Sequence, residues 1–336
     1  MTHVTYLFGA GASKNALPLV FEFPERIENC IQILKEEINQ LDDTPFTELN
    51  ISKSKRTLQT EFIDALYWMQ SECKNHASVD TFAKKLYLRK DTAELMQLKA
   101  TLSCYITMEQ ILNKYDKRYD SFFASILNTS CFDLPSNIKI LSWNYDSQIE
   151  IAYNAYSDRN HISLNHETLN ICTKFTKSKA NPDKFGIFKI NGTTGYGGSF
   201  GVVPNNDSMI CELNKAGIEI IINCYGNLKY KKYNSQLLSF AWEDQELKSE
   251  ENIVGQSIIA VKNTEVLVVI GYSFPFFNRE VDRKIIGSMN QLKKVYFQSP
   301  EAAALKERFL GIRQDFKSYE VQERYDTGQF LLPVEL

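Results

Sequence analysis

Short runs rich in β-branched, aliphatic and aromatic residues recur along the chain, and most of them end in a small or polar tip. Compact apolar runs of this kind are typical of strands that are buried on both faces of a parallel sheet. They predict strands at 4–8, 138–141, 186–190, 219–223, 266–270 and 294–298.

The segment between the first two predicted strands has a helical pattern instead. It holds no Pro or Gly between Pro45 and Pro135, and its apolar residues recur three and four positions apart, as on one face of a helix. We expect helices around 62–73, 79–86, 95–106 and 119–128, with Ser78 as the N-cap of the second.

Two further helices are expected, at 149–156 and from Asp282 onward. The alternation of strands and helices predicts an α/β fold with a Rossmann-like doubly wound parallel sheet. The sheet domain is expected at 1–15 and 136–336, and the segment 16–135 is expected to form an inserted α-helical module.

Four of the predicted strands lead into polar or glycine-rich tips, which are GAGAS (9–13), SWNYD (142–146), NGTTG (191–195) and GYS (271–273). Ligands of open α/β sheets bind at the carboxyl ends of the strands, so these tips are expected to meet. Gly9 and Gly11 lack a Cβ that would keep out a phosphate, and Ser13 can donate a hydrogen bond to one. A tight structural turn is the alternative for this loop, and Lys14 is either a phosphate ligand or a solvated side chain.

A dehydrogenase is disfavoured by the same loop. Its fingerprint requires a third glycine where Lys14 stands, and a compact βαβ unit with an acidic residue about 20 positions on. Here the next predicted strand begins only at 138.

Composition narrows the function classes further. The chain is 43% hydrophobic, which is typical of a folded protein. Its formal charge of −3 gives no overall electrostatic basis for nucleic-acid binding. The basic run 229–233 is interpreted as a solvated face, with a nucleic-acid surface as the alternative.

No apolar run reaches the length of a membrane span and no signal peptide is recognised, so we expect a cytoplasmic protein. The seven cysteines form no CxxC pair and the four histidines form no HExxH, so no metal site is expected.

Five motifs, taken in order, resemble the sirtuin-like domain of bacterial anti-phage defence proteins. They are GAGAS (9–13), SVDTF (78–82), WNYD (143–146), KINGT (189–193) and GYS (271–273), and the resemblance as a whole covers roughly residues 4–300. The resemblance implies NAD binding and, in the defence branch, hydrolysis of NAD to nicotinamide and ADP-ribose, which depletes the cell of NAD. The deacylase branch carries a zinc module with paired CxxC, which this chain lacks.

The resemblance also assigns site residues. It implies pyrophosphate contacts for Gly9, Ala10, Gly11 and Ser13. It implies catalytic-loop roles at the nicotinamide ribose and carboxamide for Asn144 and Asp146, with cofactor contacts for Gly192 and Thr193. It implies adenosine contacts for Gly271 and Ser273, and a place near the adenine for Gln298. A strand-end cap is the alternative for Asn144, and a helix N-cap is the alternative for Asp146.

Asn191 departs from the pattern of this family, which has a histidine there as the general base. An amide accepts no proton at neutral pH. Three outcomes follow: Asn191 suffices for slow hydrolysis, His161 or His166 supplies the base, or the protein binds NAD without turnover.

The function expected is therefore an NAD glycohydrolase of phage defence, with a silent NAD- or ADP-ribose-binding regulatory subunit as the alternative. Partners implied by resemblance are further copies of the chain and a DNA-translocase ATPase encoded in the same operon. The glycine-rich segment 196–198 is expected to be a loop that closes over the ligand or a surface connection. The aromatic cluster 274–277 is expected to be a pocket wall or an oligomer contact.

Overall fold

The computed structural model describes residues 1–46, 53–175, 181–198, 201–204, 213–230, 235–244, 252–313 and 320–336. Its centre is a parallel sheet of seven strands in the order β10-β9-β8-β1-β2-β4-β3. The strands are β1 (Val4–Phe8), β2 (Ile138–Ser142), β3 (Ile171–Cys172), β4 (Gly186–Lys189), β8 (Val266–Ile270), β9 (Lys294–Gln298) and β10 (Val321–Arg324). The chain builds outward from β1 on one side and then returns to β8 on the other, so the strand order reverses between β1 and β8.

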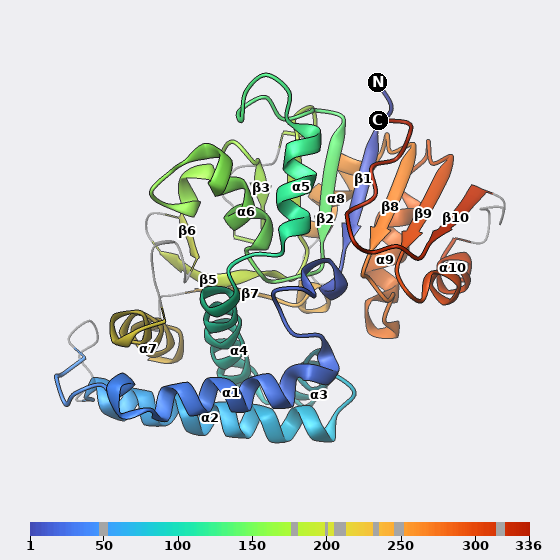
Figure 1. The fold of residues 1–336 in the computed structure, drawn as a ribbon. Coiled ribbons are helices and arrows are strands. Elements are labelled where there is room, and N and C mark those ends of the chain that lie inside the picture. Colours follow the sequence, from blue (N-terminus) through green and yellow to red (C-terminus); the bar gives the residue numbers. More distant parts are fainter. Residues whose placement is uncertain are drawn as a thin grey trace.

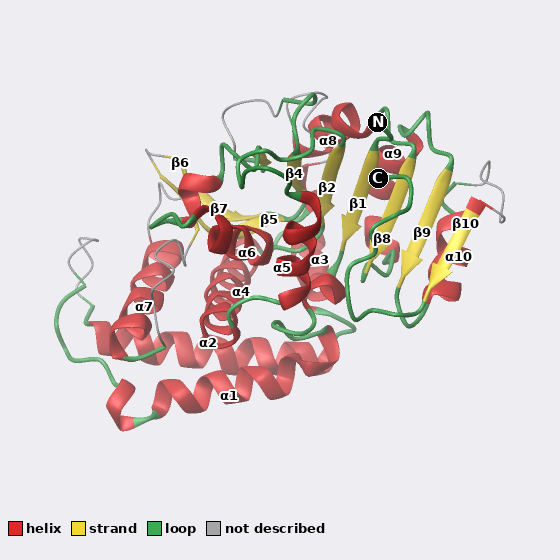
Figure 2. Ribbon diagram, turned by 45° about the horizontal axis from the view of Figure 1, so that its top comes forward, coloured by secondary structure: helices red, strands yellow, loops and turns green. Residues whose placement is uncertain are grey.

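Helices cover both faces of this sheet, which confirms the doubly wound α/β fold (Figures 1 and 2). One face carries α5 (Lys117–Ile126) and α6 (Gln148–Ser157), and the other carries α8 (Ile253–Val261), α9 (Arg279–Gly287) and α10 (Ala302–Leu310). Alternate residues of β1 serve the two faces, as the two-residue period of a strand requires. Tyr6 and Phe8 pack in the cluster that contains α5, and Leu7 packs in the cluster that contains α9.

A helical layer lies beyond the carboxyl ends of the strands (Figure 1). It contains α1 (Phe23–Lys35), α2 (Lys55–Asn75), α3 (Val79–Arg89), α4 (Thr92–Asn113) and α7 (Lys215–Tyr230), which share one hydrophobic cluster. The predicted helices α2 to α5 are confirmed. Ser78 is the N-cap of α3, because its Oγ accepts a hydrogen bond of 3.1 Å from the Thr81 N–H.

The predicted strand at 219–223 is wrong, because these residues belong to helix α7. Ile218, Ile221, Ile222 and Tyr225 are buried among α2 and α4, and Ile220 is 40% exposed. A helix that is buried on most of its surface has apolar residues on nearly every side. Five consecutive residues of such a helix therefore have the same apolar pattern as a buried strand.

The expected loop at 196–198 is also wrong. These residues belong to β5 (Gly192–Gly198), which pairs antiparallel with β6 (Gly201–Pro204) and β7 (Ser235–Leu238) in a second, three-stranded sheet. Residues 231–234, which include most of the basic run, lie outside the described residues.

The packing joins segments that are distant in sequence. Helix α5 packs on the parallel sheet, and α7 joins the helical layer although it follows β5 and β6 in the chain. The described part of the chain contains no helix with the length and apolar character needed to cross a membrane.

Candidate functional site

A cavity of about 410 Å³ lies between the parallel sheet and the helical layer, within the size range of small-molecule sites. Its walls come from the loops after β1, β2, β4 and β8, and from α1, α2 and α3. The loops after β1 and β8 flank the point where the strand order reverses, which is where open α/β sheets bind ligands. The predicted convergence of the strand ends is therefore present.

Eight of the predicted site residues line this cavity: Gly9, Ala10, Ser13, Asn144, Asp146, Asn191, Gly271 and Ser273. Gly11, Gly192, Thr193 and Gln298 are not among the lining residues. Gln298 instead holds the C-terminal segment, since its Nε2 donates to Asp326 O and Gln329 O and its Oε1 accepts from Leu331 N. Gly192 has φ 72°, and a Cβ there would lie 1.9 Å from Leu237 O, so its packing against β7 explains this glycine.

The first loop is built by close packing against the loop after β8. A Cβ on Gly9 would lie 2.6 Å from Gly271 O, and a Cβ on Gly11 would lie 2.7 Å from Gly271 Cα. The N–H groups of Gly9 and Gly11 donate to Ile270 O and Gly271 O. The turn is a short 3-10 helix, Ala10–Ser13. These glycines are therefore required by the contact between the two loops, and their amide groups are not available to a phosphate.

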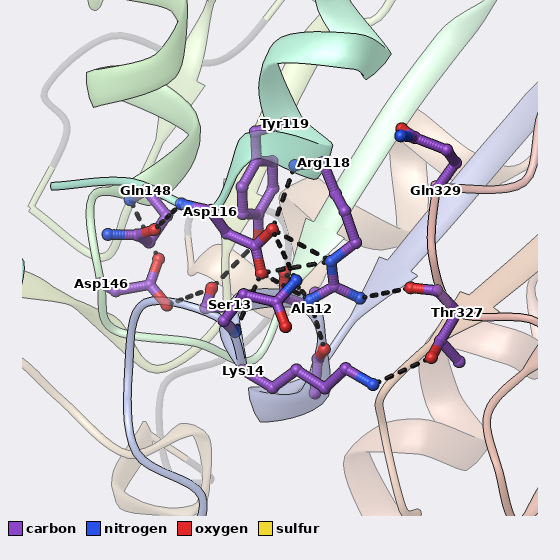
Figure 3. A network of polar contacts seen from close by, with 12 residues as sticks. Ala12, Ser13, Lys14, Asp116, Arg118, Tyr119, Asp146, Gln148, Thr327 and Gln329 are labelled. Carbon is purple, nitrogen blue, oxygen red and sulfur yellow. Dashed lines mark hydrogen bonds and ion pairs between the residues drawn. The ribbon is translucent and has the colours of Figure 1, made fainter. Parts of the chain in front are cut away.

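Arg118 binds the backbone of the loop after β1 (Figure 3). Its guanidinium donates to Gly11 O at 3.0 Å and Ala12 O at 3.1 Å, and it forms a buried ion pair of 2.6 Å with Asp116. Lys14 is not among the lining residues, and its ammonium donates to Thr327 Oγ1 at 2.9 Å. Arg118 is 3% exposed, so this network is a rigid support for the loop, outside the cavity lining.

Ser13, Asn144 and Asp146 form one buried hydrogen-bonded group at the cavity. Asn144 Nδ2 donates to Gly9 O at 3.0 Å. Ser13 Oγ donates to Asp146 Oδ2 at 2.9 Å, as Figure 3 shows. A carbonyl oxygen only accepts, so the contact with Gly9 O fixes which end of the Asn144 amide is the NH₂ group. Among the described residues, no group donates to Asn144 Oδ1. That oxygen is the acceptor which this group can offer to a ligand.

The Asp146 carboxylate is engaged at both oxygens, because Oδ1 also accepts from the Gln148 N–H at the start of α6. Burial raises the pKa of Asp146, and the charge of Lys189 opposes that rise. Lys189 donates to Asp146 O and forms an ion pair of 2.6 Å with Glu150. The helix-cap alternative for Asp146 is thus present in part, and the carboxylate chiefly orients Ser13.

Asn191 lines the cavity but both ends of its amide are bonded to backbone. Its Nδ2 donates to Trp143 O at 3.0 Å, and its Oδ1 accepts from the Ala241 N–H at 3.1 Å. Asn191 therefore ties the end of β2 to the segment after β7. An amide held in this way is a positioning group, and it accepts no proton.

Asn191→Ala is expected to lower the free energy of unfolding by about 1–3 kcal/mol, because the Ala241 N–H and Trp143 O lose their buried partner. Urea unfolding measures this. Asn290→Ala, the same change at an exposed asparagine, is the control and should change stability by less than about 0.5 kcal/mol. Equal stability of the two variants would contradict the tie.

Neither histidine proposed as a substitute base reaches the cavity. His161 and His166 flank the short 3-10 helix Ile162–Asn165, and neither is among the lining residues. The outcome in which one of them supplies the base has no support from their positions.

Asp80 is a cavity residue that the sequence did not assign to the site. It lies in the first turn of α3 and lines the cavity together with Tyr145. Burial raises the pKa of Asp80 to about 6, and its own backbone N–H and Tyr145 partly oppose that rise. Asp80 as a whole residue is half-buried, and it lines the cavity. The SVDTF motif was the available signal, but its place at the cavity depends on how the helical layer packs against the sheet.

An aromatic pair forms another wall. The rings of Trp143 and Tyr272 are stacked with centroids 5.4 Å apart and planes inclined by 4°. Tyr272 donates to Asp282 at 3.0 Å, and burial raises the pKa of Asp282 to about 8. Asn278 Nδ2 donates to the Tyr272 hydroxyl at 3.2 Å. Tyr272 is thereby fixed in place, and this wall is rigid.

The aromatic cluster 274–277 divides between core and pocket. Phe274 is buried, Pro275 and Phe277 line the cavity, and Phe276 is 82% exposed. Part of the cluster is therefore a pocket wall.

The ionisable side chains of the lining are Asp80, Asp146, Cys73, Tyr145 and Tyr272, with no Lys, Arg or His among the lining residues described. Burial raises the pKa of Cys73 to about 12, so it is a neutral thiol and a poor nucleophile near pH 7. The described residues contain no cluster of His, Cys, Asp and Glu that could hold a metal ion. The cavity thus combines aromatic walls with negative charge, which suits a cationic aromatic ring.

Comparisons with protein-family models, with curated proteins and with solved structures find no match to this chain.

Proposed function

We propose that the cavity binds NAD and that the protein hydrolyses the bond between nicotinamide and ribose. The observation that carries this proposal is the convergence of four strand-end loops on one cavity at the β1/β8 switch point, with Asn144 held so that no group in the described part of the chain donates to its Oδ1. The nicotinamide ring of NAD is a cation, and it matches a lining with two carboxyl groups and two stacked aromatic rings.

Positioning of the ribose and of the attacking water is one requirement of the reaction. Loss of nicotinamide creates an oxocarbenium-like centre on the ribose, as in glycoside hydrolysis. Asn144 Oδ1 can accept a hydrogen bond from a ribose hydroxyl or from the attacking water, and its anchor on Gly9 O keeps it in place. Fixed dipoles of this kind stabilise developing charge without reorganisation.

The biological role proposed is anti-phage defence by NAD depletion, as the resemblance of the motifs implies. Assembly with further copies of the chain, or with a DNA-translocase ATPase, is part of the same proposal. Its direct test in cells is the NAD content after infection, which should fall in cells that carry the protein and stay constant in cells that carry its Asn144→Ala variant.

The biochemical test follows nicotinamide release from NAD by the purified full-length chain. Asn144→Ala is expected to lower the rate about 100-fold or more, because a preorganised hydrogen-bonding group at the reacting centre is lost. Asn290→Ala, an amide removed from an exposed position, should leave the rate unchanged. Binding of NAD measured by calorimetry, without any release of nicotinamide, would overturn the hydrolase.

A silent NAD- or ADP-ribose-binding subunit is the second candidate. The observation that favours it is Asn191, which stands where the resembled family has its general base and has both ends of its amide bonded to backbone. This candidate predicts NAD or ADP-ribose binding that Asn144→Ala weakens, with no turnover in any variant.

A further inference from the structure

The cavity needs a group that can take a proton from water if hydrolysis is to proceed, and its lining offers few. Asn191 is an amide, Cys73 is a neutral thiol, and burial raises the pKa values of Tyr145 and Tyr272 well above their ordinary range. Asp146 accepts hydrogen bonds at both carboxylate oxygens, from Ser13 and from the Gln148 N–H. Among the ionisable lining residues, this leaves Asp80 to accept a proton from water.

We propose that Asp80 is the general base of the hydrolysis, taking the place of the histidine that Asn191 replaces. This inference rests on the proposed function, and it assigns the catalytic base to the helical layer, while the other polar groups come from the sheet. The sequence position of Asp80 in α3 and its place in the cavity lining are the two facts that carry it.

The contacts of Asp80 suit this role. Tyr145 directly follows Asn144 in the chain, and both residues line the cavity together with Asp80, so Asp80 shares the cavity with the loop that carries Asn144. The titratable groups that face Asp80 are Cys73 from α2, Tyr145 from the loop after β2 and Tyr272 from the loop after β8. No described Lys or Arg acts on the Asp80 carboxyl, so its proton affinity is not reduced by a cation.

The reaction balances with this single base. The bond between ribose C1′ and the ring nitrogen of nicotinamide breaks, and its electron pair goes to that nitrogen, which becomes neutral. The water oxygen forms the new bond to C1′, and the proton that the water loses passes to the Asp80 carboxylate and then to solvent. The leaving group starts as a cation and needs no proton, so no general acid is required.

A near-neutral pKa is suited to this task. A carboxyl with a pKa of about 6 is ionised at pH 7 and is still more basic than an ordinary aspartate. The kcat/KM for NAD should therefore rise with pH through about 6 and level off above it. This follows because only the deprotonated carboxyl accepts the proton.

The test compares pH profiles of nicotinamide release by the full-length chain. Asp80→Asn is expected to lower kcat about 100-fold, to change NAD affinity only a few-fold, and to abolish the rise near pH 6. Asp80→Glu should restore part of the rate. Tyr145→Phe should move the rise to higher pH, because the Tyr145 hydroxyl lowers the pKa of Asp80. Asp64→Asn, which removes an exposed carboxyl from α2, is the matched control and should have the wild-type profile.

The two proposals fail in distinguishable ways. Nicotinamide release by the wild type with an unchanged rate and pH profile in Asp80→Asn would overturn the role of Asp80 and leave the hydrolase standing. A wild type that binds NAD and releases no nicotinamide between pH 5 and 9 would overturn the hydrolase and the base together. If Asp80→Asn loses both activity and stability, Tyr145→Phe distinguishes a catalytic role of Asp80 from a structural one. A purely structural role would not shift the pH profile of Tyr145→Phe.

Discussion

Glu150→Gln is expected to lower the free energy of unfolding by about 3–5 kcal/mol, because it removes the ion-pair partner of the buried Lys189 ammonium. Lys189 is 1% exposed and Glu150 is 2% exposed, and their charged atoms are 2.6 Å apart. The ammonium also donates to Asp146 O. The loss should therefore loosen the loop that carries Asn144 as well as destabilise the fold. Urea unfolding of the full chain measures the change.

Two control variants test whether the loss of stability comes from the buried charge. Glu280→Gln is the same substitution in an exposed i,i+4 pair with Lys284, and it should cost less than about 0.5 kcal/mol. The double replacement Lys189→Met/Glu150→Leu should recover most of the stability, because it removes both buried charges together. A Glu150→Gln variant as stable as Glu280→Gln would show that the buried pair contributes little.

Five of the seven strands of the sheet were predictable because each is a short apolar run that is mostly buried, whereas the two-residue β3 and the polar β10 were not predicted. Val266–Ile270 and Val4–Phe8 are nearly without polar residues, and they lie at the centre of the parallel sheet. The same signal failed at 219–223, where the apolar residues belong to a helix buried in the helical layer. Five residues are too few to separate a period of two from a period of 3.6 when most positions are buried.

The site was predictable where it depends on strand ends and was missed where it depends on packing between layers. The tips after β1, β2, β4 and β8 meet because parallel strands end on one edge of the sheet. Asp80 reaches the same cavity only because α3 is carried there by the other helices of its layer. No local pattern around Asp80 encodes that arrangement.

The glycines of the first loop show a further limit of sequence reasoning. The sequence favours Gly9 and Gly11 as clearance for a pyrophosphate, whereas in the structure the loop after β8 occupies that space. A glycine required by a neighbouring backbone and one required by a ligand look alike in sequence.

Gly271→Ala is expected to destabilise the protein by roughly 3 kcal/mol or more, because the new methyl group has no space and the backbone conformation disfavours it. Gly271 has φ 62°, and a Cβ there would lie 2.4 Å from the Cα and C atoms of Gly11. The two loops would have to separate, and with them the walls that Gly9 and Tyr272 contribute to the cavity. Thermal and urea unfolding without any ligand measure the effect.

Gly287→Ala is the matched control, since it makes the same substitution at the end of α9, where a Cβ would meet nothing within 4 Å. It should leave stability unchanged or raise it by up to about 1 kcal/mol, because alanine has less conformational freedom to lose on folding. If Gly271→Ala were instead as stable as wild type but unable to bind NAD, the glycine would serve the ligand. If it were stable and also bound NAD normally, the contact between the two loops would not be the constraint that the packing of Gly9, Gly11 and Gly271 indicates.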